Sequence, residues 1–133
     1  PKLDELVNDH FRTAVAETGF TLRRVDDKPR AGLIDDQLRV DIRNARFLIC
    51  DLSHGNRGAY WEAGYAEGLG KPVIYTCEKQ AFDAKDTRPH FDTNHHLTVI
   101  WSEHDPADAV RRLKATIRAT ILDAIQEDAP CLT

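Results

Sequence analysis

Acidic residues and glycines gather in one stretch of this chain, in a pattern suited to binding and reacting with a polar small molecule. Asp51 closes a short apolar run, and a polar loop with two glycines, Gly55 and Gly58, follows it. Glycine lets backbone N–H groups approach a ligand closely. Glu62 comes next, between aromatic and small residues. A carboxylate in this setting is predicted to occupy a packed, partly dry site.

Each charged residue of this region also has a structural interpretation, and the sequence leaves both interpretations open. Glu62 is placed where the helix dipole favours an acidic side chain. Asp51 can cap the loop after its strand, and Asp36 can be an acidic residue at the start of a helix. Arg57 can bind a phosphate or remain a solvated loop cation.

Histidines and cysteines give no pattern that predicts a metal or a disulfide framework. His90, His95 and His96 lie close in sequence, but neighbouring residues of an extended segment point to opposite sides, so His95 and His96 should not share one ion. We therefore expect no metal site and no cofactor. The three cysteines are widely spaced. Cys50 lies in an apolar run and is predicted to be a buried thiol, which fits a reducing, cytoplasmic location.

Length and composition are those of one ordinary globular domain, which we predict to span residues 1–133. The net charge is −4, with 41% hydrophobic and 30% charged residues. An acidic balance argues against nucleic-acid binding. No apolar run reaches the roughly 20 residues that span a bilayer. We expect a small-molecule partner, no nucleic acid, no membrane, and a homo-oligomer.

The elements that position these residues alternate along the chain. Apolar side chains at helical spacing or in short continuous runs predict helices over 2–18, 34–44, 59–69 and from 106 to about 127, strands over 20–25, 46–51, 72–77 and 97–101, and loops over 26–33 and 78–96. This order predicts a flavodoxin-like, doubly wound parallel sheet in an αβα arrangement of three layers. In such sheets ligands bind beyond the carboxyl ends of the strands, where Asp51 and the glycine loop lie.

The predicted order opens on a helix, although a doubly wound sheet normally opens on its central strand. The sequence also starts at Pro1 and contains no Met. These features lead us to expect that a further strand precedes Pro1 in the complete protein, and that its end contributes to the site.

The segment from Phe20 to Trp101 resembles the nucleoside 2-deoxyribosyltransferase-like superfamily. Asp36 is similar to a helix-starting Asp of that family, and Asp51 to the Asp that ends its third strand. The stretch Asn56–Ala66 resembles its Asp-x-Gly-x-x-x-Glu-x-Gly-Tyr-Ala signature, and residues 70–74, Gly-Lys-Pro-Val-Ile, resemble the Gly-Lys-Pro-Val strand that follows.

The resemblance implies a chemistry and a set of site residues. In the family the signature Glu is a nucleophile that attacks the anomeric carbon of a nucleoside and holds the sugar covalently until a second base or water accepts it, as in a retaining glycosidase. That role falls on Glu62, with Asp36 and Asp51 positioning sugar and base. The implied site has catalytic residues Glu62 and Asp51, and substrate-binding residues Asp36, Asn56, Arg57, Gly58 and Tyr60.

One departure from the signature keeps several functions open. Asn56 stands where the family has Asp, and an amide can donate and accept hydrogen bonds but cannot take up a proton as a carboxylate does. Residues 76–93 also resemble a bacterial branch related to Toll/interleukin-1 receptor (TIR)-like domains, several of which cleave NAD with a helix Glu. We expect N-glycosidic bond cleavage or transfer on a nucleoside, nucleotide or NAD-like substrate. The alternative is a non-catalytic nucleotide-sensing module for signalling or defence.

Overall fold

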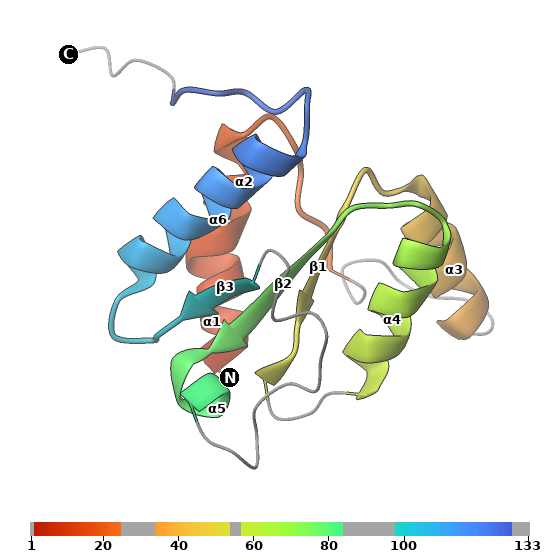
Figure 1. Ribbon diagram of the computed structural model, residues 1–133, viewed down its shortest axis with the longest axis horizontal. Helices are drawn as coiled ribbons and strands as arrows, with labels where there is room; N and C mark the ends of the chain where they lie inside the picture. The colour runs from red at the N-terminus through yellow and green to blue at the C-terminus, as the bar shows by residue number, and fades with distance from the viewer. Residues whose placement is uncertain (1, 25–33, 54–56, 84–97, 129–133) are drawn as a thin grey trace.

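Three parallel strands of the described residues form a sheet at the centre of the molecule (Figure 1). The computed structural model describes residues 2–24, 34–53, 57–83 and 98–128. Strand β2 (Val73–Glu78) lies between β1 (Leu48–Asp51) and β3 (Thr98–Trp101). Both pairings are parallel, with Asp51 opposite Thr76. The prediction that the strand ending at Asp51 lies beside the next strand of the chain, in parallel, is confirmed.

One face of the sheet is covered by helices from the first and the last described segments of the chain. The N-terminal helical run consists of α1 (Lys2–Leu6), a π-helical turn η1 (Val7–Phe11) and α2 (Arg12–Glu17), and α6 (Pro106–Thr120) lies beside it (Figure 1). Asp105 begins α6 by accepting a hydrogen bond from the Asp108 N–H, with Pro106 in the first turn. The buried side chains of this face include Phe11, Val15, Ile74, Val99, Leu113 and Ile117.

The other face is covered by α3 (Ile34–Asn44) and α4 (Arg57–Gly68) (Figure 1). Three buried alanines of α4 recur at helical spacing and let this helix lie close to the strands. They pack with buried side chains from α3, β1 and β2, and the core of this face contains Ile42, Cys50, Leu52, Ala59, Ala63, Ala66, Val73 and Tyr75. None of the described helices is long and apolar enough to cross a membrane.

Strand alternation assigns the residues of β1 to opposite faces of the sheet. Cys50 and Leu52 pack in the core beneath α3 and α4, whereas Ile49 packs with the residues beneath α1 and α6. Successive side chains of a strand point to opposite sides. Asp51 therefore shares the side of Ile49, away from α4.

The described part of the predicted strand at 20–25 is not a strand. Residues 20–24 carry no ladder hydrogen bonds, although their sequence favours extended structure. They are held instead by side chains: Arg12 donates to the carbonyl of Leu22 at 3.1 Å, and Phe20 packs edge-on against Phe47 with ring centres 5.2 Å apart. A strand needs a neighbouring strand, and β1 pairs only with β2 among the described residues.

The predicted end of the last helix is also wrong. Apolar spacing continues through Ile121 and Ile125, but α6 ends at Thr120 and Ile121 is extended, with φ −103° and ψ 113°. The chain then turns back, and Ile125 N–H donates to the carbonyl of Thr18 at 2.9 Å. This contact replaces the helical bond that Ile125 would have made. A short helix α5 (Lys79–Asp83), which the sequence did not predict, follows β2.

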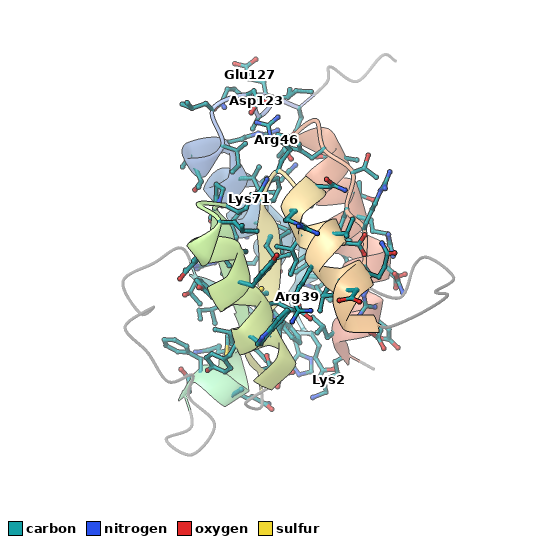
Figure 2. The ribbon with its side chains drawn as sticks, turned by 90° about the vertical axis from the view of Figure 1, so that its right-hand side faces the viewer. Lys2, Arg39, Arg46, Lys71, Asp123 and Glu127 are labelled. Carbon is teal, nitrogen blue, oxygen red and sulfur yellow. The ribbon has the colours of Figure 1, made fainter. Side chains whose placement is uncertain are left out.

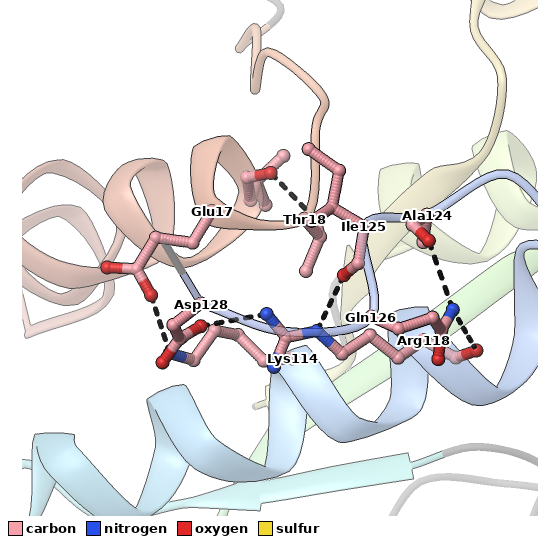
Figure 3. A network of polar contacts seen from close by, with 9 residues as sticks. Glu17, Thr18, Lys114, Arg118, Ala124, Ile125, Gln126 and Asp128 are labelled. Carbon is pink, nitrogen blue, oxygen red and sulfur yellow. Dashed lines mark hydrogen bonds and ion pairs between the residues drawn. The ribbon is translucent and has the colours of Figure 1, made fainter. Parts of the chain in front are cut away.

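Ion pairs hold this returning segment against the helices (Figure 3). Lys114 on α6 contacts both Glu17 of α2, at 2.5 Å, and Asp128, at 3.1 Å. Arg118 contacts Asp128 at 2.8 Å and also donates to the carbonyl of Ile125. The segment after α6 is thus connected to α6 and to the N-terminal helical run.

Candidate functional site

A hollow of about 310 Å³ lies between α3 and the N-terminal half of α4. Leu38 and Arg39 line it from α3, and Gly58, Trp61 and Glu62 line it from α4. Gly58 and Glu62 are four residues apart and so lie on one side of the helix. Because α4 begins shortly after β1 ends, the hollow is close to the carboxyl end of that strand.

Glu62 is the acidic residue among the described residues that line this hollow. Its side chain is half-buried, and burial raises the pKa of its carboxyl above the ordinary value of 4.5. No described residue donates a hydrogen bond to this carboxylate or forms an ion pair with it. Buried polar groups normally have such partners. The carboxylate of this half-buried side chain is therefore open to a ligand or to water.

Arg39 contacts the ring of Trp61, the neighbour of Glu62 in the chain, and Trp61 stacks on Tyr65. Figure 2 labels Arg39 at the α3–α4 side of the molecule. Its guanidinium carbon lies 5.5 Å from the centre of the Trp61 ring. The Trp61 and Tyr65 rings, one helical turn apart, are 5.5 Å apart and nearly parallel at 3°. Cation–π contact and stacking together restrict the orientation of the arginine.

Asp51 is hydrogen-bonded within the sheet. Its Oδ2 accepts from Thr76 Oγ1 at 2.7 Å and from Trp101 Nε1 at 2.8 Å, and its Oδ1 accepts from Ser53 N–H at 3.0 Å. These bonds connect the ends of β1, β2 and β3. Ser53 extends the network, because its Oγ accepts from the N–H of Glu78 at 2.8 Å.

The structure does not bring Asp51 and Glu62 together within the described residues. Asp51 lies on the side of the sheet covered by α1 and α6, whereas Glu62 belongs to a helix on the other side. Asp51 is also not among the described residues that line the hollow. The expectation that both carboxylates line one pocket does not hold for this part of the chain.

The predicted substrate-binding residues occupy different positions. Gly58 lines the hollow. Asp36 is exposed on α3 and touches the hollow only through Arg39, whose Nη1 lies 3.4 Å from its carboxylate. Tyr60 is half-buried and packs against the core between α4 and the sheet. Arg57 begins α4, but its side chain and the whole of Asn56 lie outside the described residues.

The described cysteines are not candidates for nucleophilic chemistry. Cys50 and Cys77 are buried free thiols. Burial, with the nearby charge of Glu62 as the next cause, raises the pKa of Cys50 to about 12, and burial raises that of Cys77 to about 11. A thiol must lose its proton to act as a nucleophile, so both are inert near neutral pH.

No metal site is formed by the described residues. They place no group of three His, Cys, Asp or Glu side chains where an ion could be held. The three histidines considered as ligands in the sequence, His90, His95 and His96, lie outside the described residues.

Sequence reasoning did not single out Arg39 or Leu38. Arg39 follows Asp36 at helical spacing, which reads as an ordinary surface ion pair. Its relation to Trp61 depends on the packing of α3 against α4, and no local pattern reports that. Trp61 lay inside the signature-like stretch, yet only its neighbours Tyr60 and Glu62 were assigned roles.

Comparison of the chain with protein-family models, with curated proteins and with solved structures finds no match. Function is therefore inferred from the side-chain geometry of the hollow and from the chemistry of its residues. Among the described residues that line the hollow, Glu62 and Arg39 are the charged ones.

Proposed function

We propose that this chain cleaves or transfers the N-glycosidic bond of a nucleoside, nucleotide or NAD-like molecule, with Glu62 as the nucleophile. The observation that carries this proposal is the half-buried Glu62 carboxylate, which lines a hollow and has no hydrogen-bond donor or ion-pair partner among the described residues. Such a group costs folding free energy. Costs of this kind are concentrated at sites where the group has a chemical task.

The reaction follows from the chemistry of a carboxylate beside a sugar. An oxygen of Glu62 attacks the anomeric carbon, the carbon–nitrogen bond breaks, and its electron pair leaves with the base. A base that is neutral in the substrate then takes a proton from water, whereas a cationic nicotinamide leaves as a neutral molecule and takes none. In the second step a water molecule or a second base attacks the same carbon. The bond to Glu62 then breaks, which restores the carboxylate. The acceptor releases one proton to solvent, from its O–H when it is water and from its N–H when it is a second base.

The arrangement of elements supports the same proposal. We propose a flavodoxin-like fold, since helices cover both faces of a parallel sheet and the strand order β1-β2-β3 follows the chain. The stretch that resembles the deoxyribosyltransferase signature falls on α4, with Glu62 in its second turn. The free thiols Cys50 and Cys77 are compatible with the cytoplasmic location that belongs to this proposal.

One observation favours the second candidate, a nucleotide-sensing module without catalysis. The hydrogen bonds from Thr76, Trp101 and Ser53 occupy the carboxylate of Asp51. Asp51 is therefore not placed to assist Glu62 as an acid or base. A sensor needs only a hollow that binds nucleotide, and its binding would survive the loss of the Glu62 charge.

Turnover of a substrate panel separates the two candidates. The wild-type chain is incubated with nucleosides, nucleotides and NAD, and the released base is measured by chromatography. We expect Glu62→Gln to lower base release on the order of a thousandfold or more, since Gln keeps the shape but is a far weaker nucleophile. Glu5→Gln, an exposed position on α1, serves as the matched control. If the wild type releases no base but binds nucleotide equally well with Gln at position 62, the protein is a sensor.

A further inference from the structure

The outer edge of β1 presents backbone hydrogen-bonding groups that no strand of the described residues pairs with. Leu48 and Leu52 donate their N–H groups to β2, at 3.0 and 2.9 Å. In a parallel ladder, alternate residues direct their N–H and C=O groups to opposite edges of the strand. The groups of Ile49 and Asp51 therefore point away from β2, and β1 is the last strand of the described sheet on that side. Backbone groups inside a fold normally have partners.

Helices of both layers extend past this edge of β1. Figure 2 shows α3 and the N-terminal helical run on the same side of β1, the side away from β2. The apolar side chains near this edge are only partly buried, and they come from both layers and from β1 itself: Phe20, Leu22, Leu38 and Ile49. Incomplete burial of this kind is expected where a strand is missing between two covering layers.

Residues 20–24 have the direction and the composition of a further parallel strand. They run in the same direction as β1 (Figure 1). Phe20, at the start of this segment, packs against Phe47, which immediately precedes β1, with ring centres 5.2 Å apart. The sequence favours extended structure, yet the guanidinium of Arg12, rather than a neighbouring strand, donates to the Leu22 carbonyl. The segment therefore lacks only a neighbour to pair with.

The handedness of the connections between strands fixes where that neighbour belongs. Crossovers between parallel strands are right-handed in about 98% of cases, so the face that carries the connecting helix shows the direction in which the chain moves across the sheet. Helix α4 joins β1 to β2 on one face, and α3, on the same face, leads into β1. Residues 20–24, which precede α3, therefore belong on the outer side of β1. The N-terminal helical run leads into residues 20–24 on the opposite face, so the strand before this run lies on the β1 side of them.

We infer that a further parallel strand, supplied by a segment that leads into α1 in the complete protein, lies between β1 and residues 20–24. The start of α1 is in the right place for this connection, because Lys2 Nζ lies 3.7 Å from the carboxylate of Glu78, the last residue of β2. Helix α1 thus begins at the carboxyl edge of the sheet, where a parallel strand beside β1 ends.

The surroundings of this strand determine its chemistry. It receives the N–H and C=O groups of Ile49 and Asp51, and helices cover both of its faces. Strands covered on both faces are continuously apolar rather than alternating, so the segment is an apolar run of about five residues. Its carboxyl end lies beside that of β1, where ligands of doubly wound sheets bind.

The test adds such a strand to the chain and asks whether β1 pairs with it. An N-terminal extension, Val-Ile-Val-Ile-Val, is joined to the chain through a Gly/Ser linker of about four residues or of about eight. The control extension has Pro at its central positions, which keeps it apolar but removes the N–H donors of a ladder. Amide hydrogen exchange is measured by NMR at Ile49 and Asp51. Leu52, which already donates to Thr76, is the reference.

We expect the amides of Ile49 and Asp51 to exchange at least about tenfold faster than that of Leu52 in the chain without an extension. With the Val/Ile extension their exchange should slow to the rate of Leu52, because they then donate to the added strand. The midpoint of urea denaturation should rise by about 0.5 M or more, since more apolar surface is buried. The Pro extension should change neither property.

Three results overturn the inference. If Ile49 and Asp51 are as protected as Leu52 without any extension, the edge of β1 is already occupied. If neither linker length slows their exchange, or if the Pro extension slows it equally, β1 does not pair with a preceding strand. If the same peptide added separately on a Lys-rich tail protects both amides while neither extension does, the strand does not lead into α1. None of these measurements uses base release, so the inference is independent of the proposed function.

Discussion

Glu62 connects burial to reactivity at the scale of a single residue. Removal of the carboxylate from water disfavours its charged form, and this burial raises its pKa above 4.5. A nucleophilic carboxylate reacts in the ionised form. Base release by the proposed enzyme should therefore decrease as the pH falls through this raised pKa, at a higher pH than an exposed Glu would give.

The same burial predicts how stability changes when Glu62 becomes Gln. The folded state holds the Glu62 proton more tightly than the unfolded state, so this group favours folding below pH 4.5 and loses that effect as pH rises through the raised pKa. Gln carries no charge to desolvate. We expect Glu62→Gln to melt at a higher temperature than wild type at pH 7, with the difference shrinking below pH 4.5. Thermal denaturation across this range measures it, and a difference that does not change with pH would contradict the burial argument.

Asp51 is predicted to be a structural residue of the sheet rather than a catalytic one. In Asp51→Asn an NH₂ group replaces one oxygen, and it must face either Ser53 N–H or the donors on Thr76 and Trp101. Two donors then meet in a partly buried place. We expect a loss of about 2–4 kcal/mol in the free energy of unfolding, measured by urea denaturation. Thr76→Val removes only one of the three bonds and should cost about 1 kcal/mol.

The opposite outcome for Asp51 is also informative. If Asp51→Asn keeps full stability but abolishes base release, Asp51 acts in the chemistry and the geometry described for it is not that of the working enzyme. Unfolding alone would lower stability and base release together. Base release is therefore measured well below the melting temperature of the variant, where unfolding cannot account for its loss.

Single residues were predictable in position but not in partnership. The apolar run before Asp51 and the small residues around Glu62 correctly indicated a strand end and a partly buried carboxylate. Strand alternation predicts which residues share a side of the sheet with Asp51. It does not predict which helices cover that side. Its contact with Trp101 joins residues fifty positions apart, and such a pairing depends on the order of strands in space.

Elements were predictable where a local pattern decides them. The bounds of α3 agree with those expected, because apolar residues recur at helical spacing between two polar segments. The predicted strand at 20–25 was wrong in its described part, because a sequence that favours extended structure becomes a strand only beside another strand. The predicted end of α6 was wrong, because Ile121 and Ile125 continue the apolar spacing of the helix. The N–H of Ile125 instead donates to the carbonyl of Thr18, which is distant in sequence.

Glycines in and after α4 give a prediction for this element. Gly64 lies inside the helix, and a Cβ atom added there would meet nothing within 4 Å. Alanine at this position should stabilise the chain by about 0.5–1 kcal/mol, because glycine loses more backbone entropy in a helix. Gly70 also has open space but adopts φ +76°, so alanine should cost about 1 kcal/mol or more there. Chemical denaturation of the two variants should therefore show shifts of opposite sign.

A contrary result for Gly64 would have a specific meaning. If Gly64→Ala destabilises the chain in a manner that depends on protein concentration, a second molecule approaches this face of α4 closely. That outcome would contradict the open surface described here and would support the homo-oligomer expected from the sequence.

For the whole molecule, β2 joins two hydrophobic cores into one structure. Ile74 packs beneath α1 and α6, while its neighbours Val73 and Tyr75 pack beneath α3 and α4. Every residue of β2 is buried, whereas β1 and β3 each contain both buried and partly exposed residues. Alternation of helices and strands predicted this layered α/β arrangement, because each buried strand requires cover on both sides.

Surface ion pairs are expected to contribute less to the free energy of unfolding than the two cores do. Arg46, before β1, forms two bonds of 2.7 Å with Asp123, after α6, and both residues are labelled in Figure 2. Both side chains are more than half exposed. Pairs in such positions are typically worth less than about 1 kcal/mol. We therefore expect cooperative unfolding to depend on the two cores rather than on such pairs.

If β2 joins the two cores, a truncation in either core should destabilise both of them. Leu52 and Leu113 are fully buried on opposite sides of the sheet, and truncation of either to Ala should lower the free energy of unfolding by about 2–5 kcal/mol. Trp61→Phe, introduced in all variants, leaves Trp101 as the sole tryptophan, and Trp101 lies in the core opposite Leu52. Both cores contain residues of β2, so we expect them to unfold together. The unfolding transitions measured by Trp101 fluorescence and by far-UV circular dichroism should therefore coincide in both variants. If Leu52→Ala shifts the circular dichroism transition but leaves the Trp101 transition unchanged, the two faces of the sheet unfold independently.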